Sequence, residues 1–208
     1  MKKVLPALLF ASFSQLSWAD SVNYDFIEFQ WQQLDVPTSS YQDSYAGVAM
    51  PGEQFDGFGV SYSRRLPENW LFRANYWSAD SEGMYESSLF KADSRQVGLG
   101  IGYVFDLTDV QSIDISADIG RFRYQVRDGG EVRSNTFGGQ LNFRWQLTDR
   151  LELNTGAQYV DYRVDWLTDE TSAHVGLDYR FSNRLSVGGR YRQYNDADAS
   201  EVYVRYRF

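Results

Sequence analysis

The sequence predicts an all-β chain that closes on itself as an antiparallel, up-and-down transmembrane β-barrel. Apolar and polar residues alternate along many segments, as they do when one face of a strand meets lipid and the other faces a polar interior. Short turns and longer polar stretches also alternate along the 208 residues. Aromatic residues make up 17% of the chain, which suits the two interfacial girdles of a membrane barrel.

The first 19 residues have the pattern of a secretory signal peptide. Lys2 and Lys3 form a basic start, an apolar run follows, and Ala19 is a small residue of the kind favoured before a cleavage site. We therefore expect residues 1–19 to be removed and residues 20–208 to form one barrel domain. No later stretch approaches the roughly 20 consecutive apolar residues that a membrane helix needs.

Turn-forming residues divide the remaining chain into ten predicted strands. Short turns rich in Pro, Asn, Asp and Ser are expected at 66–69, 107–109, 147–150 and 182–184. Longer polar loops are expected at the other end of the barrel, at 36–53, 79–93, 127–133, 166–171 and 195–198. The predicted strands are 22–35, 54–65, 70–78, 94–106, 110–126, 134–146, 151–165, 172–181, 185–194 and 199–208.

The two faces of the strands are clearest where the period of two is regular. In the strand 94–106 the residues expected to face lipid are Val97, Leu99, Ile101, Tyr103 and Phe105, and glycines occupy most of the inward positions. The parity slips after Ile119 and again after Tyr159. A β-bulge, or a strand that leaves the membrane into a projecting hairpin, would explain both slips.

Charged residues at inward positions predict a polar network in the lumen. Its expected members are Glu28, Asp114, Asp118, Arg144, Glu152, Asp178, Arg180, Arg190, Arg192, Arg205 and Arg207. Arginine and carboxylate groups can neutralise each other there through bidentate pairs. The strands 54–65 and 94–106 face them with glycine and serine, so we expect side chains to cross the barrel and fill it. A narrow polar pore beside this glycine wall is the alternative.

The sequence offers one candidate for a catalytic base, because His174 is the single histidine. Its candidate partners are Asp161, Asp165, Ser172 and Asp178. No catalytic motif surrounds these residues, so a lumen hydrogen bond is the favoured role and an enzyme is the less favoured alternative. The chain has no cysteine and no calcium-loop spacing, so we predict no disulfide, metal or other cofactor.

The last strand carries a further signal. Val204, Tyr206 and Phe208 alternate with Arg205 and Arg207, and this pattern resembles the carboxy-terminal assembly signal of bacterial outer-membrane β-barrel proteins. With the signal-peptide pattern and the glycine- and aromatic-rich strands, the mature chain resembles the small outer-membrane barrel family that includes the OmpA and OmpX types and porin-like short barrels. Eight strands are commoner in the OmpA type and are the alternative to ten.

The resemblance also implies where in the cell the protein lies and which molecules surround it. It implies insertion by the barrel-assembly machinery and residence among outer-membrane lipid and lipopolysaccharide, with the short turns and both mature ends in the periplasm. The net charge of −8 argues against nucleic acid, and no external ligand is indicated. The loops are acidic and carry aromatic residues, Tyr41, Tyr45, Tyr85 and Phe90, which suit either an adhesive surface or a cap on the barrel. We expect a non-enzymatic barrel with a structural or surface-interaction role, or alternatively a narrow porin-like channel for small solutes or ions.

Overall fold

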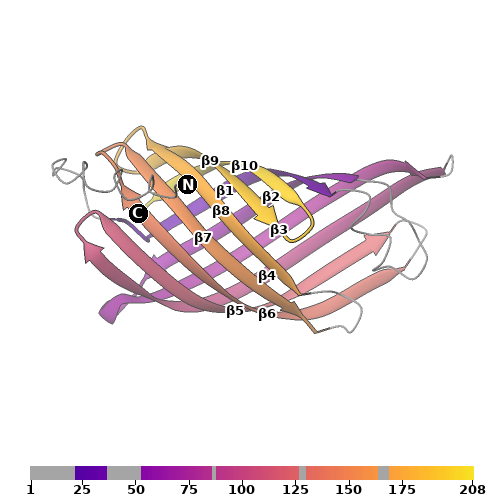
Figure 1. Cartoon of the computed structure of the whole chain (residues 1–208), viewed down its shortest axis with the longest axis horizontal. Coiled ribbons are helices and arrows are strands. Elements are labelled where there is room, and N and C mark those ends of the chain that lie inside the picture. The colour runs from indigo at the N-terminus through magenta and orange to yellow at the C-terminus, as the bar shows by residue number, and fades with distance from the viewer. Residues whose placement is uncertain (1–21, 37–52, 86–87, 127–129, 164–168) are drawn as a thin grey trace, which may run out of the picture.

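Ten antiparallel strands close into one barrel, in which each strand pairs with its neighbours in sequence and the first pairs with the last (Figure 1). The computed structural model describes residues 22–36, 53–85, 88–126, 130–163 and 169–208. The strands are β1 (Phe26–Val36), β2 (Glu53–Arg65), β3 (Trp70–Tyr85), β4 (Ser88–Thr108), β5 (Gln111–Val126), β6 (Glu131–Gln146), β7 (Leu151–Tyr162), β8 (Glu170–Arg180), β9 (Leu185–Tyr194) and β10 (Asp198–Arg207). The predicted ten-stranded, up-and-down barrel is confirmed.

Some of the predicted features lie outside the described residues. These are the signal peptide at 1–19, nearly all of the loop at 36–53 with Tyr41 and Tyr45, and parts of the loops at 127–133 and 166–171. In the part of the chain that the structure describes, no helix is long and apolar enough to cross a membrane.

The two ends of the barrel differ, and we name them by what they hold. The terminal end holds Phe26 and Arg207, which are cross-strand partners, and the short turns, including the 3-10 helix η2 (Pro67–Asn69). The hairpin end, opposite, holds the long hairpin of β3 and β4, which projects beyond the other strands in Figure 1.

The outer surface of the barrel is apolar over its middle, and the inner surface is largely polar. Ile101 is 57% exposed and Ile119 is 59% exposed on the outside, whereas Asp114 and Glu152 inside are 0% and 1% exposed. A soluble barrel has the reverse arrangement. Polar inside and apolar outside is the distribution that a lipid bilayer favours, because the outward side chains of the middle band then meet hydrocarbon.

No β-bulge accounts for the slips of parity in β5 and β7. The register between β4 and β5 is continuous from Leu99↔Ile119 to Gln96↔Phe122, and that between β6 and β7 is continuous at Gly138↔Val160. The interior itself changes toward the hairpin end, where apolar side chains pack inside the barrel. This interior apolar cluster is built from Phe55, Ala79, Ala92 and Tyr124, with Leu34, Trp77, Phe122, Val126, Val132 and Ala197 packed against it.

The prediction of a loop at 79–93 is wrong, because most of this segment belongs to two paired strands. β3 continues to Tyr85 and β4 starts at Ser88, with unbroken pairing from Ala79↔Ser94 to Tyr85↔Ser88. Above the lipid a strand needs no apolar outer face, so its outward positions can be charged, as at Asp80, Glu82, Lys91 and Asp93, and the segment resembles a loop in sequence. β6 and β8 likewise begin at Glu131 and Glu170, inside stretches predicted as loops.

Candidate functional site: the barrel lumen

The centre of the lumen is built where the barrel closes. Glu28 on β1 and Arg205 on β10 are cross-strand partners, and Glu28 Oε2 accepts hydrogen bonds from Arg205 Nε at 3.0 Å and Nη2 at 2.7 Å. Glu28 Oε1 accepts a third hydrogen bond from Arg190 Nη2 on β9 at 3.2 Å. Three strands are therefore joined around one buried carboxylate.

The network continues from this centre toward the terminal end. Arg144 Nε donates to Glu152 Oε1 at 2.8 Å, and Arg205 Nη1 lies 3.4 Å from the same oxygen. Arg207 Nη2 donates to Asp178 Oδ1 at 2.8 Å. These five side chains are at most 6% exposed. Positive and negative groups alternate, which offsets the free-energy cost of removing each charge from water.

Toward the hairpin end the network is held by Glu201 on β10. Its two carboxylate oxygens accept from Arg190 Nη1 at 2.8 Å and from Arg192 Nε at 3.0 Å. Arg192 also donates to Gln158 Oε1 on β7 at 3.1 Å. Glu201 was not among the predicted lumen residues, although it has the same parity as the inward residues Arg205 and Arg207.

An aromatic ring fills the space between the guanidinium groups. Arg190 and Arg205 lie 4.9 Å and 5.2 Å from the centroid of the Tyr203 ring. The ring lies directly over Gly188 on β9, because a Cβ atom at that position would be 2.2 Å from Tyr203 Cζ. The hydroxyl group of Tyr203 accepts a hydrogen bond from Asn154 Nδ2 at 3.2 Å.

A smaller cluster of polar side chains lies on the wall formed by β3 to β6, opposite the arginines of β9 and β10. Arg73 Nη2 donates to Asp114 Oδ1 at 2.7 Å, and Asn142 Nδ2 donates to the same oxygen at 2.8 Å. Arg73 was also not among the lumen residues predicted from the sequence. Asp118 lies along the glycine wall, since a Cβ atom at Gly100 would be 2.0 Å from its Oδ1. The glycines of this wall therefore make room for neighbouring side chains.

The chain before β1 enters the barrel mouth, so the predicted first strand, 22–35, begins too early: β1 starts at Phe26. Tyr24 is 2% exposed, and its hydroxyl group lies 2.9 Å from Ser112 Oγ on β5. Burial raises the pKa of Tyr24 to about 12, so the hydroxyl group stays protonated at pH values where an exposed tyrosine ionises. Val22 and Tyr24 pack against Leu71, and Arg144 Nη1 donates to the Asn23 carbonyl oxygen at 2.8 Å.

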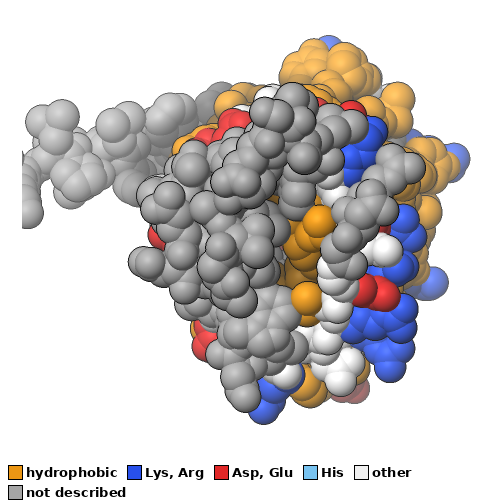
Figure 2. All heavy atoms as spheres, turned by 90° about the vertical axis from the view of Figure 1, so that its right-hand side faces the viewer, with side chains coloured by type: hydrophobic (Ala, Val, Ile, Leu, Met, Phe, Trp, Pro, Cys, Tyr) orange, Lys and Arg blue, Asp and Glu red, His pale blue; other side chains and the backbone are white. Residues whose placement is uncertain are grey.

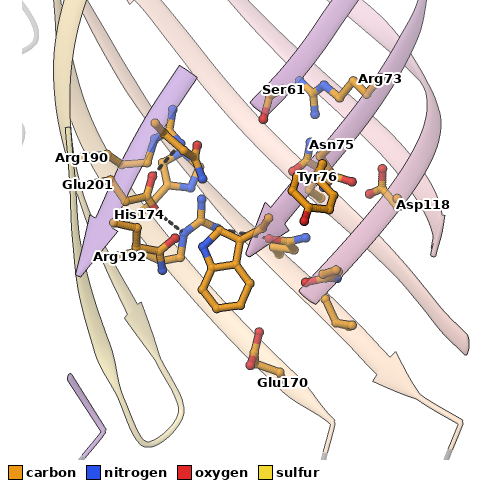
Figure 3. Close-up of a pocket in the computed structure, with 18 of the residues that line it drawn as sticks. Ser61, Arg73, Asn75, Tyr76, Asp118, Glu170, His174, Arg190, Arg192 and Glu201 are labelled. Atoms are coloured by element: carbon orange, nitrogen blue, oxygen red, sulfur yellow. Dashed lines mark hydrogen bonds and ion pairs between the residues drawn. The ribbon is translucent and has the colours of Figure 1, made fainter. Parts of the chain in front are cut away.

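Two cavities lie along the lumen, and side chains of the network line both. The one toward the hairpin end is about 450 Å³; His174, Arg190 and Arg192 lie on one side of it, and Asn75 and Asp118 on the other (Figure 3). The second, at the terminal end, is also about 450 Å³ and is lined by residues that include Tyr24, Arg180 and Arg207. Arg144, Glu28 and Arg205 line the first cavity, and Arg207 lines the second. Glu152 and Asp178, which pair with these arginines and line neither cavity, lie at the boundary between the two.

The structure places the remaining network candidates around this arrangement. Arg180 donates to Gln146 Oε1 at 3.1 Å, at the terminal end. Asp118 is near Arg73 and Ser116, apart from the Glu28 and Glu152 clusters.

His174 lies in the cavity wall without a catalytic arrangement around it. Its cross-strand partners are Gly156 and Arg192, and its Nδ1 atom is buried with no hydrogen-bond partner among the described residues. Asp161 pairs in register with the outward Phe137, and Asp178 is bonded to Arg207. Asp165 lies outside the described residues. The carboxylate that would orient an imidazole base is therefore not provided by Asp161 or Asp178.

The three residues of the predicted assembly signal all point outward. Val204, Tyr206 and Phe208 are 45%, 41% and 48% exposed. The Phe208 ring stacks on Tyr62 of β2, with the ring centroids 5.8 Å apart and the planes at 17°.

Comparison with solved structures finds other barrels of the outer membrane. The translocator domain of the autotransporter NalP from Neisseria meningitidis is 15% identical, with a TM-score of 0.52 over 91% of this chain and 90% of that one. An outer-membrane channel from Pseudomonas putida F1 is 11% identical, with a TM-score of 0.51 over 92% and 98%. The NanC porin is 8% identical, with a TM-score of 0.50 over 88% and 100%. At these identities the likeness concerns the fold alone.

Comparison with sequences gives the family. No curated protein matches the chain. The family described as "Protein of unknown function, DUF481" matches residues 62–203, which is more than half of the sequence. The chain therefore belongs to the DUF481 family.

Proposed function

We propose that the chain is an integral outer-membrane β-barrel protein with a closed lumen, no enzymatic activity, and a structural or surface-interaction role. The apolar outer surface and the fold shared with outer-membrane barrels support the location. In this proposal the terminal end faces the periplasm, the hairpin end faces outward, and the barrel-assembly machinery inserts the chain.

The observation that carries the closed lumen is the set of buried ion pairs where the two cavities approach each other. Glu28, Glu152 and Arg205 are each at most 4% exposed in their side chains, and every one has two or more charged partners. A continuous water path would have to displace these side chains. Breaking a buried pair leaves an uncompensated charge and costs about 3–5 kcal/mol, so the open arrangement is strongly disfavoured.

Residues 22–25, the segment before β1, cover the part of the barrel mouth that the ion-pair network does not fill. It crosses from β1 to the wall formed by β3, β4 and β5, where Tyr24 contacts Ser112 and packs with Leu71 and Val104. The mouth at the terminal end is therefore covered by a segment of the chain itself.

A narrow channel is the second candidate, favoured by the cavity toward the hairpin end. That cavity is lined by charged groups of both signs, including Arg192 on one wall and Asp118 on the other. Charged walls of this kind suit a selective path for ions or small solutes. The channel would need the network to open.

Conductance in a planar lipid bilayer tests the two candidates. We expect no steady conductance from the refolded parent, and we expect a variant with Tyr24→Ala and Arg205→Ala to conduct. The matched control is Arg64→Ala, an exposed arginine next to the turn at the terminal end. Steady steps from the parent, with an ion selectivity that Arg192→Gln changes, would establish the channel and overturn the closed lumen.

The surroundings of His174 support the absence of an enzymatic role. Asp161 faces outward, Asp178 is committed to Arg207, and Arg192 is the cross-strand partner of His174. An acid–base site needs a base oriented by a third group and close to a nucleophile, and these residues do not supply it.

A further inference from the structure

Three arginines stand side by side on the outer surface at the hairpin end. Arg95 on β4 is the cross-strand partner of Arg123 on β5, and Arg123 is the partner of Arg133 on β6. Cross-strand partners have Cβ atoms about 4.5–5.5 Å apart, and like charges at such positions destabilise a sheet. The row therefore favours binding of anionic groups beyond the carboxylates that these strands supply.

Two further arginines extend this row. Arg121 is exposed on β5, two residues from Arg123, and Arg163 directly follows β7 with its amide bonded to the Asn135 carbonyl at 3.2 Å. We call the five arginines 95, 121, 123, 133 and 163 the arginine patch. Figure 2, which looks onto this end of the molecule, shows Lys and Arg side chains gathered along one side.

Carboxylates neutralise the arginine patch incompletely. Glu131 contacts Arg123 and Arg133, Asp93 lies 3.3 Å from Arg95, and Asp161 lies 3.2 Å from Arg163. Five guanidinium groups thus meet three carboxylates among the described outward residues of β4 to β7 and Arg163. Arg133 and Arg163 remain 72% and 61% exposed in their side chains, so their guanidinium groups are accessible.

The patch borders the apolar band of the barrel. Along their strands, Arg95 and Arg121 are each two residues from outward apolar side chains, Val97 and Ile119. The Arg163 guanidinium lies 4.7 Å from the centroid of the outward Phe137 ring. The arginines are therefore placed where lipid headgroups begin, directly above the acyl chains.

The opposite side of the same rim is acidic. Asp35 on β1 is the cross-strand partner of Asp198 on β10, and Asp56 on β2 is the partner of Asp80 on β3. A phosphate group is repelled there and attracted to the arginine patch. At the hairpin end, an anionic lipid is therefore expected to bind on the side of the barrel that carries the arginine patch and not on the acidic side.

We infer that the arginine patch binds the phosphate groups of lipopolysaccharide in the outer leaflet. Guanidinium groups match phosphate oxygens bidentately, and the acyl chains of the same molecule would lie along Val97, Ile119 and Phe137. The inference rests on the proposed outer-membrane location and orientation, and it names the lipid that the hairpin end contacts.

The test measures binding of lipid A, the phosphorylated acylated anchor of lipopolysaccharide, to the refolded barrel in detergent by native mass spectrometry. The parent is expected to bind bisphosphorylated lipid A about tenfold more tightly than its dephosphorylated form. The variant with Arg121→Gln, Arg123→Gln and Arg133→Gln is expected to lose this difference. Arg64→Gln, which changes an exposed arginine at the terminal end, is the matched control and is expected to keep it.

Heat-modifiable mobility on electrophoresis reports the folding of each protein. Should the triple variant fail to fold, Arg121→Gln alone is expected to reduce the preference by about threefold. Equal binding of the two lipid A forms by the parent, or an unchanged preference in the folded variants, would overturn the inference. Full displacement of lipid A by millimolar inorganic phosphate would also overturn it, because the site would then recognise free phosphate. The proposed location fails separately, if the protein is absent from outer-membrane fractions.

Discussion

Glu28 and Arg205 join the first and last strands of the barrel at the position where the sheet closes. They are 177 residues apart in sequence, are direct cross-strand partners, and share two hydrogen bonds. A slip of one residue between β1 and β10 would carry one of the two side chains to the lipid face. The pair therefore specifies the register of the seam as well as filling the lumen.

The first prediction concerns this pair. Arg205→Ala leaves Glu28 and Glu152 short of a buried partner, and we expect it to lower the free energy of unfolding by about 3–5 kcal/mol. Urea unfolding of the refolded barrel in lipid vesicles, followed by tryptophan fluorescence, measures the loss. Arg64→Ala, on the outer surface, is the control and should change stability by less than about 0.5 kcal/mol.

A double variant separates pairing from packing. Glu28→Gln with Arg205→Met removes both charges while keeping much of the volume, and we expect it to be more stable than Arg205→Ala. If the losses of Glu28→Gln and Arg205→Met simply add in the double variant, the two side chains are not coupled and the seam pair has no special role.

The second prediction concerns the contact of Tyr203 with Gly188. A Cβ atom at Gly188 would be 2.2 Å from the tyrosine ring, whereas one at the adjacent Gly189 would meet its nearest atom at 3.7 Å. Gly188→Ala should therefore cost about 1–3 kcal/mol, because the ring between Arg190 and Arg205 must move. Gly189→Ala should be neutral or slightly stabilising. Equal stability of the two variants in urea would contradict the placement of the ring.

The fold was predictable because the turn residues and the period of two are local signals. The ten strands, their order and the outward apolar positions such as Leu99 and Ile101 follow from neighbours along the chain. The rule that places polar residues inside holds only where lipid lies outside. At the hairpin end Phe122 and Tyr124 face inward, and the change in polarity looked like a change in parity.

The lumen was less accessible to sequence reasoning because its contacts cross the barrel. Parity alone identifies Glu28 and Arg205 as inward, but it does not reveal that Glu152 lies between Arg144 and Arg205. The entry of Tyr24 into the mouth depends on a contact with Ser112, 88 residues away. No pattern in residues 22–25 distinguishes a first strand from a segment that folds across the mouth.

The third prediction concerns that segment. Tyr24→Phe removes the hydrogen bond with Ser112 and should lower stability by about 1 kcal/mol. Tyr24→Ala also removes a fully buried ring, so we expect a loss of about 3–5 kcal/mol. Iodide quenching of tryptophan fluorescence and urea unfolding measure solvent access and stability. If both variants behave as the parent does, the segment does not close the mouth.

The last prediction tests the absence of enzymatic activity at His174. A hydrolase or acyl-modifying site in this lumen would use the single imidazole of the chain as its general base. His174→Gln keeps a polar side chain of similar size, so the barrel should fold with unchanged heat-modifiable mobility. Cells that carry the parent, the variant or no protein should then show the same lipid A, the same phospholipids and the same cleavage of a peptide library, all measured by mass spectrometry. A product that the parent makes and the folded variant does not would show that His174 takes part in a reaction, because the substitution removes the imidazole while leaving Arg190, Arg192 and Glu201 in place.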